Sequence, residues 1–215
     1  MAKSEVDIVN EGESFSQRGP SEVDRRRWLI ACGATGGVAA AGVGIPFAVS
    51  MAPSEKARSA GAPVEVDIAE IPPGGLKTVE WRGKPVWIVR RTPEMLKTLD
   101  GLDSKLADPQ SDRKEIPTPD YAKNSHRSIK PEIWVGVGIC SHLGCSPVSK
   151  FPQGKNSDMG NDWPGGFLCP CHGSTFDIAG RVYANKPAPD NLEVPRHMYV
   201  SETKVVIGKD EKGEA

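Results

Sequence analysis

The chain has 215 residues and a formal net charge of -1, which excludes a strongly basic protein that binds nucleic acid through its overall charge. Apolar residues make up only 38% of it, and its 23 glycines and 19 prolines favour a loop-rich β domain over a helical bundle. The length accommodates one membrane anchor and one domain of about 150 residues.

The chain begins with a polar tail and continues into an apolar stretch. Residues 1–24 carry six acidic residues against two basic ones, and such a composition predicts a disordered N-terminal tail. Residues 25–52 combine the cluster Arg25-Arg26-Arg27 with an uncharged run from Trp28 to Ala52. As a helix, this run spans roughly 37 Å, which is enough to cross a bilayer with some tilt.

The arginines predict the orientation of this anchor. Basic residues stay on the cytoplasmic side, so the tail would be cytoplasmic and the rest of the chain would lie in the periplasm of a bacterium. An arginine pair before an apolar run also resembles a twin-arginine export signal. A cleaved signal peptide is the alternative, because Ser50-Met51-Ala52 is a passable cleavage site. A retained anchor is favoured, since the apolar run is longer than a typical signal core.

Two further features concern the anchor and the segment directly after it. Gly33 and Gly37 form a G-x-x-x-G pair, which either permits close packing of membrane helices or only reflects a weakly hydrophobic export signal. Residues 53–63 have no apolar period and the composition of a linker, which predicts a flexible tether.

Residues 64–215 form the predicted head, and their pattern predicts a series of short strands. Thr92-Pro93 is typical of a helix start, with Thr as the N-cap and Pro in the first position. Residues 100–130 are polar and interrupted by prolines, and they predict an excursion on the head surface. Strands are predicted at 64–68, 78–81, 85–91, 133–139, 192–194 and 197–200. Short strands separated by turn signals indicate an antiparallel β sandwich or barrel.

Two loops concentrate the residues that can bind a metal, Cys140-Ser141-His142-Leu143-Gly144-Cys145 and Cys169-Pro170-Cys171-His172-Gly173-Ser174. They hold four of the five cysteines and two of the four histidines. The spacing is C-x-H-x-x-C, then 23 residues, then C-x-C-H. Two thiolates and two imidazoles can hold one metal centre. The remaining cysteines, Cys145 and Cys171, have matching positions and could bridge the loops.

These two boxes resemble those of Rieske 2Fe-2S proteins, and the extra cysteine in each box resembles the Rieske subunit of quinol–cytochrome c oxidoreductases. The resemblance implies a Rieske-type antiparallel β sandwich head whose cluster-binding part covers about 138–189. It implies that Cys140 and Cys169 bind one iron of a 2Fe-2S cluster and that His142 and His172 bind the other. A Cys2His2 zinc site uses the same ligands, but the paired extra cysteines would have no role in it.

The resemblance also assigns roles to residues around the cluster. It implies a disulfide between Cys145 and Cys171, which fits an oxidising compartment, and a hydrogen bond from Ser174 to a bridging sulfide. Leu143 and the segment Pro187-Ala188-Pro189 would shield the site. Phe176 stands where related proteins often have a Tyr that donates to a cysteine sulfur. This difference predicts a lower reduction potential than in the relatives that have the Tyr, though still within the Rieske range. The other two histidines of the chain, His126 and His197, are interpreted as surface or structural residues.

The function implied by this resemblance is electron transfer at high potential. Imidazole ligands reduce the negative charge on the cluster, so potentials fall roughly between −150 and +300 mV, against about −400 mV for all-cysteine plant-type clusters. The implied reaction oxidises ubiquinol at the cytochrome b site, with His172 contacting the quinol and accepting a proton. The electron then passes to a c-type cytochrome, with coupled proton translocation.

The implied partners are the cytochrome b and c-type cytochrome subunits of a dimeric complex in the bacterial inner membrane. Two alternatives belong to other classes of protein. One is a Rieske electron carrier of another periplasmic oxidoreductase, although oxygenase-type members generally lack the extra cysteines and the anchor. The other is a zinc-binding structural module, which would be colourless and would give no paramagnetic signal.

Overall fold

The computed structural model describes residues 21–55 and 61–213. Most of the predicted acidic tail, residues 1–20, and the middle of the predicted tether, residues 56–60, therefore lie outside the described residues. The chain divides into two compact units, Met1–Pro53 and Ser54–Ala215. Each unit is described by itself.

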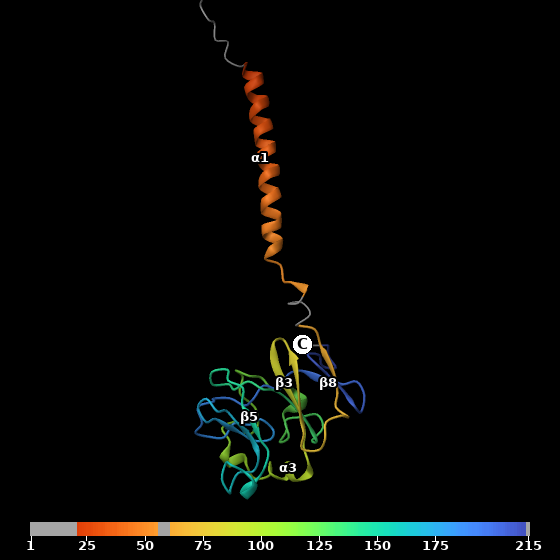
Figure 1. The fold of residues 1–215 in the computed structure, drawn as a ribbon, viewed down its shortest axis with the longest axis vertical. Helices are drawn as coiled ribbons and strands as arrows, with labels where there is room; N and C mark the ends of the chain where they lie inside the picture. Colours follow the sequence, from red (N-terminus) through yellow and green to blue (C-terminus); the bar gives the residue numbers. More distant parts are fainter. Residues whose placement is uncertain (1–20, 56–60, 214–215) are drawn as a thin grey trace, which may run out of the picture. The chain divides into compact units, whose positions relative to one another are not determined.

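The first unit contains the helix α1, Glu22–Ser50 (Figure 1). It begins three residues before the predicted anchor because Ser21 caps it, with the Ser21 hydroxyl accepting from the backbone N–H of Asp24 at 3.2 Å. None of its side chains is buried within the structure. By length and composition, α1 is able to cross a membrane.

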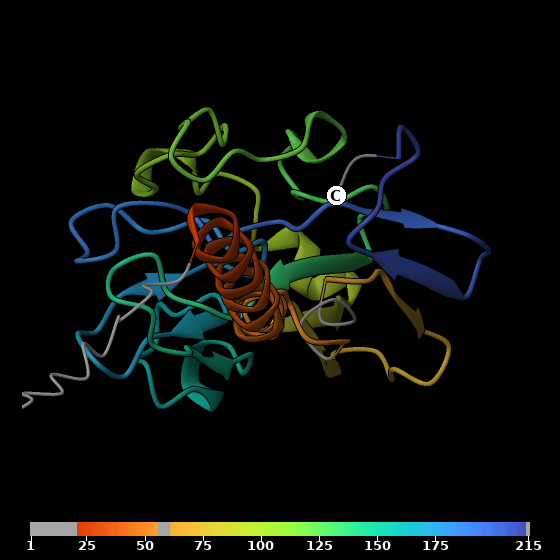
Figure 2. The ribbon, with the colours of Figure 1, turned by 90° about the horizontal axis from the view of Figure 1, so that it is seen from above.

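The second unit is built from three small antiparallel sheets, with strand orders β1-β9-β8, β2-β3-β4 and β5-β6-β7 (Figure 2). This confirms the predicted mainly β head. The strands are β1 Val64–Asp67, β2 Leu76–Trp81, β3 Lys84–Arg90, β4 Ile133–Val137, β5 Val148–Lys150, β6 Gly166–Leu168, β7 Thr175–Phe176, β8 His197–Tyr199 and β9 Lys204–Ile207. Short helices lie at α3 Pro93–Lys97, Asp103–Lys105, Asp120–Ala122 and Gly154–Asn156.

The strands predicted at 78–81 and 85–91 form a hairpin, and the predicted helix start is present. Strands β2 and β3 are joined at Arg82 and Gly83, whose φ angles of 52° and 72° match the primed turns that suit the twist of a hairpin. Helix α3 is capped by Thr92, whose side chain accepts from the backbone N–H of Met95 at 3.3 Å. Local turn and cap residues therefore act here as the sequence predicts.

The strand predicted at 192–194 is wrong. Successive residues of this stretch bond to different neighbours and not to one continuous strand. The backbone N–H of Leu192 donates to the Gly180 carbonyl, whereas the Glu193 carbonyl accepts from Val137, each at 2.8 Å. Without a repeated partner no ladder forms, although the stretch still ties β4 to the turn after β7.

Strand β4 leads directly into the first cysteine-bearing loop and is buried along its whole length. Its two faces belong to two cores. Trp134 packs in one core with Phe167 and with the site cysteines Cys140 and Cys169. The alternating residues Ile133, Val135 and Val137 pack in the other core, with Val86, Ile88 and Val205. The site therefore rests on a strand that is fixed from both sides.

Candidate metal centre

The two cysteine-bearing loops have the same backbone geometry. In each, the backbone N–H of the first cysteine donates to the carbonyl five residues later, at 2.8 Å from Cys140 and 2.7 Å from Cys169. The N–H groups of Gly144 and Gly173 donate back to those cysteines at 3.1 and 3.0 Å. Both glycines have a left-handed φ, +81° and +73°, which other residues adopt only with strain. The glycine in each box is thus required by its turn.

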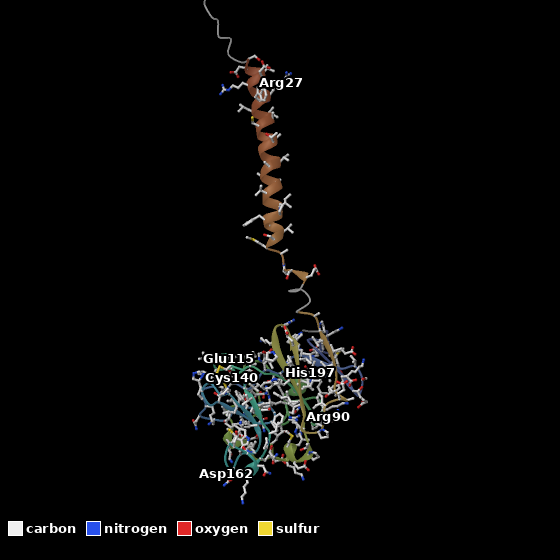
Figure 3. All side chains as sticks on the ribbon, in the orientation of Figure 1. Arg27, Arg90, Glu115, Cys140, Asp162 and His197 are labelled. Carbon is white, nitrogen blue, oxygen red and sulfur yellow. A yellow bond between two sulfur atoms is a disulfide. The ribbon has the colours of Figure 1, made fainter. Side chains whose placement is uncertain are left out.

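The structure brings the four predicted metal ligands together. Strand β4 delivers Cys140, and β6 ends immediately before Cys169. Both thiols are free and 2% exposed. The rings of His142 and His172 lie edge to face, with centroids 4.7 Å apart. Two cysteines and two histidines from separate loops therefore lie close together. Figure 3 labels Cys140 at one side of the head.

The residues present fit an iron–sulfur cluster. The Nδ1 atom of His142 is buried and has no hydrogen-bond partner among the described residues. Such a nitrogen is costly to bury unless it binds something, and a neutral imidazole nitrogen is a common metal ligand. With the two unbridged thiols of Cys140 and Cys169 beside it, the donor set is the two-cysteine, two-histidine set of a Rieske centre.

The predicted disulfide between Cys145 and Cys171 is present and joins the two loops. The sulfur atoms of Cys145, Cys171 and Cys169 all lie within 4.8 Å of one another. Because Cys145 and Cys171 are bonded to each other, this group of three sulfurs is not a set of metal ligands. The disulfide instead fixes the spacing of the loops next to Cys169.

Ser174 is fully buried at the base of the second loop. Its Oγ accepts from the backbone N–H of Ala188 at 2.9 Å, so its own hydroxyl proton is available to a sulfur. Burial raises the pKa of the Cys140 thiol, and the Cys169 thiol raises it further. Hydrogen bonds from the His142 backbone and the Ser174 side chain oppose this increase in pKa. Both bonds favour the thiolate, which is the form that binds metal.

The segment predicted to shield the site, Pro187-Ala188-Pro189, contacts the second loop through the hydrogen bond from the Ala188 N–H to Ser174. Ala188 is 2% exposed, whereas Leu143 is 72% exposed on the first loop. The sequence prediction missed Ser141, whose Oγ donates to the Asp190 carbonyl at 2.7 Å. A serine between two candidate ligands gave no signal for this contact, because its partner lies 49 residues away in the chain.

The two remaining histidines lie outside the site. His197 is 1% exposed, and its Nδ1 lies 2.8 Å from the Pro195 carbonyl, which is a structural role as predicted. Figure 3 shows it well apart from Cys140. His126 is partly buried, and its backbone carbonyl accepts from Arg91 at 2.8 Å.

Comparisons with known proteins identify the family of this chain. The model of the Rieske [2Fe-2S] domain family matches residues 122–198, which include both loops. A ubiquinol-cytochrome c reductase iron-sulfur subunit of Allochromatium vinosum is 53% identical over 197 residues, which cover 91% of this chain and 93% of the relative. The chain belongs to the family of ubiquinol-cytochrome c reductase iron-sulfur subunits. A second relative, a ubiquinol-cytochrome c reductase iron-sulfur subunit of Bradyrhizobium diazoefficiens, is 41% identical to this chain. The match covers 86% of this chain and 94% of the relative.

A solved structure described as a hyperthermophilic respiratory Complex III has a chain that is 24% identical, with a TM-score of 0.43, and the match covers 82% of this chain and 98% of that chain. Membership of the iron-sulfur subunit family confirms the predicted Rieske-type [2Fe-2S] cluster as the cofactor. Together with α1, it identifies a membrane-anchored subunit.

Proposed function

We propose that this chain is the electron carrier of a ubiquinol–cytochrome c reductase. It would oxidise ubiquinol at the cytochrome b site and pass the electron to a c-type cytochrome, with proton translocation by the whole complex. The observation that carries this proposal is the convergence of two buried thiols and two imidazoles on paired loops, in a chain of this family.

Each ligand has an assigned position in the proposed centre. Cys140 and Cys169 would hold one iron, and His142 and His172 the other. When bound, the cluster supplies a reversible one-electron couple at the raised potential that imidazole ligands give. The protein contributes a buried side, formed by the two cysteines, and an outer side, formed by the histidines. This arrangement keeps water from the thiolates and leaves the imidazoles accessible to a partner.

His172 is the proposed contact for the quinol. It is exposed, whereas His142 is partly buried, so His172 presents the more accessible ring. A ligated imidazole has a second nitrogen that can hold a proton. We infer that this nitrogen of His172 accepts the quinol proton as the electron is transferred. Ser174 would tune the potential through its hydroxyl, which is kept in place by Ala188.

The proposed topology is based on the sequence. Residues 1–24 would form a cytoplasmic tail, residues 25–52 a twin-arginine signal that is kept as an anchor, and residues 53–63 a tether. The head, residues 64–215, would lie in the periplasm, with its cluster-binding part at about 138–189. Positive charge on the cytoplasmic side supports this orientation. The partners would be the cytochrome b and c-type cytochrome subunits of a dimeric complex in the bacterial inner membrane.

An EPR-monitored redox titration of the purified full chain tests this function. We expect the signal of a mixed histidine and cysteine 2Fe-2S cluster to appear with ascorbate alone, because a centre that oxidises quinol must have a high potential. His172→Ala should abolish the signal. His126→Ala, which removes a histidine outside the site, should leave it unchanged. A signal that requires dithionite would favour a carrier for another oxidoreductase, and zinc without any signal would contradict the proposal.

A further inference from the structure

A short part of the chain, Ala188–Asp190, fastens both cysteine-bearing loops, and we refer to it as the cover segment. Its Ala188 N–H donates to Oγ of Ser174 in the second loop at 2.9 Å. In the first loop, Oγ of Ser141 donates to the Asp190 carbonyl at 2.7 Å and accepts from the Asp190 N–H at 3.2 Å. Any displacement of the cover segment therefore changes hydrogen bonds in both loops.

Arg113 holds the cover segment from outside the two loops. Its Nη1 donates to the carbonyl oxygen of Pro189 and lies 3.4 Å from Oδ1 of Asp190. Its Nη2 donates to the carbonyl oxygen of Ala107 at 3.3 Å. The planar guanidinium thus joins the cover segment to the polar excursion at 100–130. A lysine ammonium cannot reproduce this fork of donors.

The part of the excursion that carries Arg113 is itself fixed. The Asp108 carboxylate accepts from the backbone N–H groups of Asp112 and Arg113 at 3.1 and 3.4 Å. Asn191, directly after the cover segment, donates to the Asp108 carbonyl at 2.9 Å and to Oγ of Ser111 at 3.1 Å. Asn191 and Asp108 are 4% and 9% exposed, so these bonds are shielded from water. Arg113 therefore reaches the cover segment from a rigid base.

We propose that Arg113 is a positioning residue that sets the reduction potential of the centre through the cover segment, an inference that rests on the proposed function. Arg113 keeps Ala188 against Ser174, and this bond occupies the Ser174 oxygen as an acceptor. The Ser174 hydroxyl is thereby directed at sulfur. Hydrogen bonds to sulfur stabilise the reduced, more negative state and raise the potential. Loss of Arg113 loosens this chain of contacts and lowers the potential.

Charge alone is the competing explanation, because a nearby cation also stabilises a reduced cluster. The Arg113 side chain is 40% exposed, so solvent and salt screen the effect of its charge on the centre. Lys114 offers a matched control. It is the next residue in the chain, is exposed and carries the same charge.

The test compares Arg113→Gln with Lys114→Gln in the full chain, by EPR-monitored redox titration and by the rate at which the cluster signal is lost in a chelator. Both variants remove one positive charge. We expect Arg113→Gln to lower the potential and to lose the signal several-fold faster. Lys114→Gln should match the wild type in both measurements.

Equal shifts in the two glutamine variants would show an effect of charge alone and would overturn the proposal. An unchanged potential in Arg113→Gln would also overturn it. Arg113→Lys keeps the positive charge, and it replaces Arg113→Gln in the redox titration if the glutamine variant does not fold. Its potential should still fall below that of the wild type, and an unchanged value would contradict positioning. A wild-type chain without a Rieske signal would overturn the proposed function instead, so the two failures are distinguishable.

Discussion

The side chain of Phe176 is fully buried on β7 and belongs to the same core as Cys140 and Cys169. It pairs across the sheet with Phe167 on β6, which ends directly before Cys169. A phenylalanine fills this space but has no hydroxyl to donate to a cysteine sulfur. The side chain of Phe176 therefore supplies no hydrogen bond of the kind that raises the potential of an iron–sulfur cluster.

Phe176→Tyr should raise the reduction potential of the centre. The added hydroxyl can donate to a cysteine sulfur, and such a bond stabilises the reduced state. Protein-film voltammetry on the wild type and the variant would measure the shift. Phe151→Tyr is the matched control, because Phe151 also contacts Phe167, with ring centroids 5.5 Å apart, and is expected to leave the potential unchanged. A potential that stayed constant or fell in Phe176→Tyr would contradict this interpretation of Phe176.

At the scale of an element, β8 carries a buried histidine. Burial lowers the pKa of His197 from 6.5 to about 4, and the hydrogen bond to the Pro195 carbonyl opposes this only in part. The rings of Tyr121 and His197 lie edge to face, with centroids 5.4 Å apart. The Tyr121 hydroxyl accepts a hydrogen bond from the His197 backbone N–H at 2.9 Å. Neither contact replaces the hydration that a charged imidazole loses.

This burial predicts that acid destabilises the head. The unfolded chain binds a proton at His197 below about pH 6.5, whereas the folded chain does not bind it until about pH 4, so folding stability falls as pH falls between these values. The contribution lost between about pH 7 and about pH 5 is about 2 kcal/mol in the free energy of unfolding. Urea denaturation at both pH values would measure it. His197→Gln cannot be protonated and should lose less stability on acidification. An equal loss in both proteins would rule out His197 as the cause.

The sequence predicts those elements whose signals are local. The alternation of Ile133, Val135 and Val137 predicted β4, and the Thr92 cap predicted α3. The paired boxes predicted which cysteines and histidines converge. The alternation did not reveal that Trp134 on the other face of β4 faces a second core, since a large aromatic residue occurs on either face of a strand.

The contacts that hold the cover segment cannot be predicted from the sequence. Arg113 and Pro189 are 76 residues apart in the chain, and a lone arginine in a polar stretch is usually a solvated residue. The strand predicted at 192–194 failed for a related reason. Its apolar alternation is real, but its hydrogen-bond partners lie on several segments that only the folded head brings together. Periodicity indicates which face is buried, and not which partner is bonded.

At the scale of the whole molecule, the chain joins an apolar helix to a compact head that contains all four proposed ligands. None of the described residues of α1 is buried in the structure. An exposed apolar helix of 29 residues is unfavourable in water, and a bilayer is the solvent that removes this cost. A retained anchor therefore predicts a head bound to the membrane, whereas a cleaved export signal predicts a soluble head.

We expect the full chain, expressed in a bacterium, to remain in the membrane fraction with its N-terminal segment intact. The apolar run from Trp28 to Ala52 is long enough to span a bilayer and is preceded by three arginines that hold one end in the cytoplasm. Intact-mass spectrometry of the membrane fraction measures whether residues before Ala52 are kept. Replacing Arg25 and Arg26 by Lys tests the export signal, and the cluster-loaded head should then fail to reach the periplasm. A soluble periplasmic protein whose mass corresponds to a chain that starts after Ala52 would instead show cleavage, because α1 is the one helix among the described residues that is long and apolar enough to span a membrane.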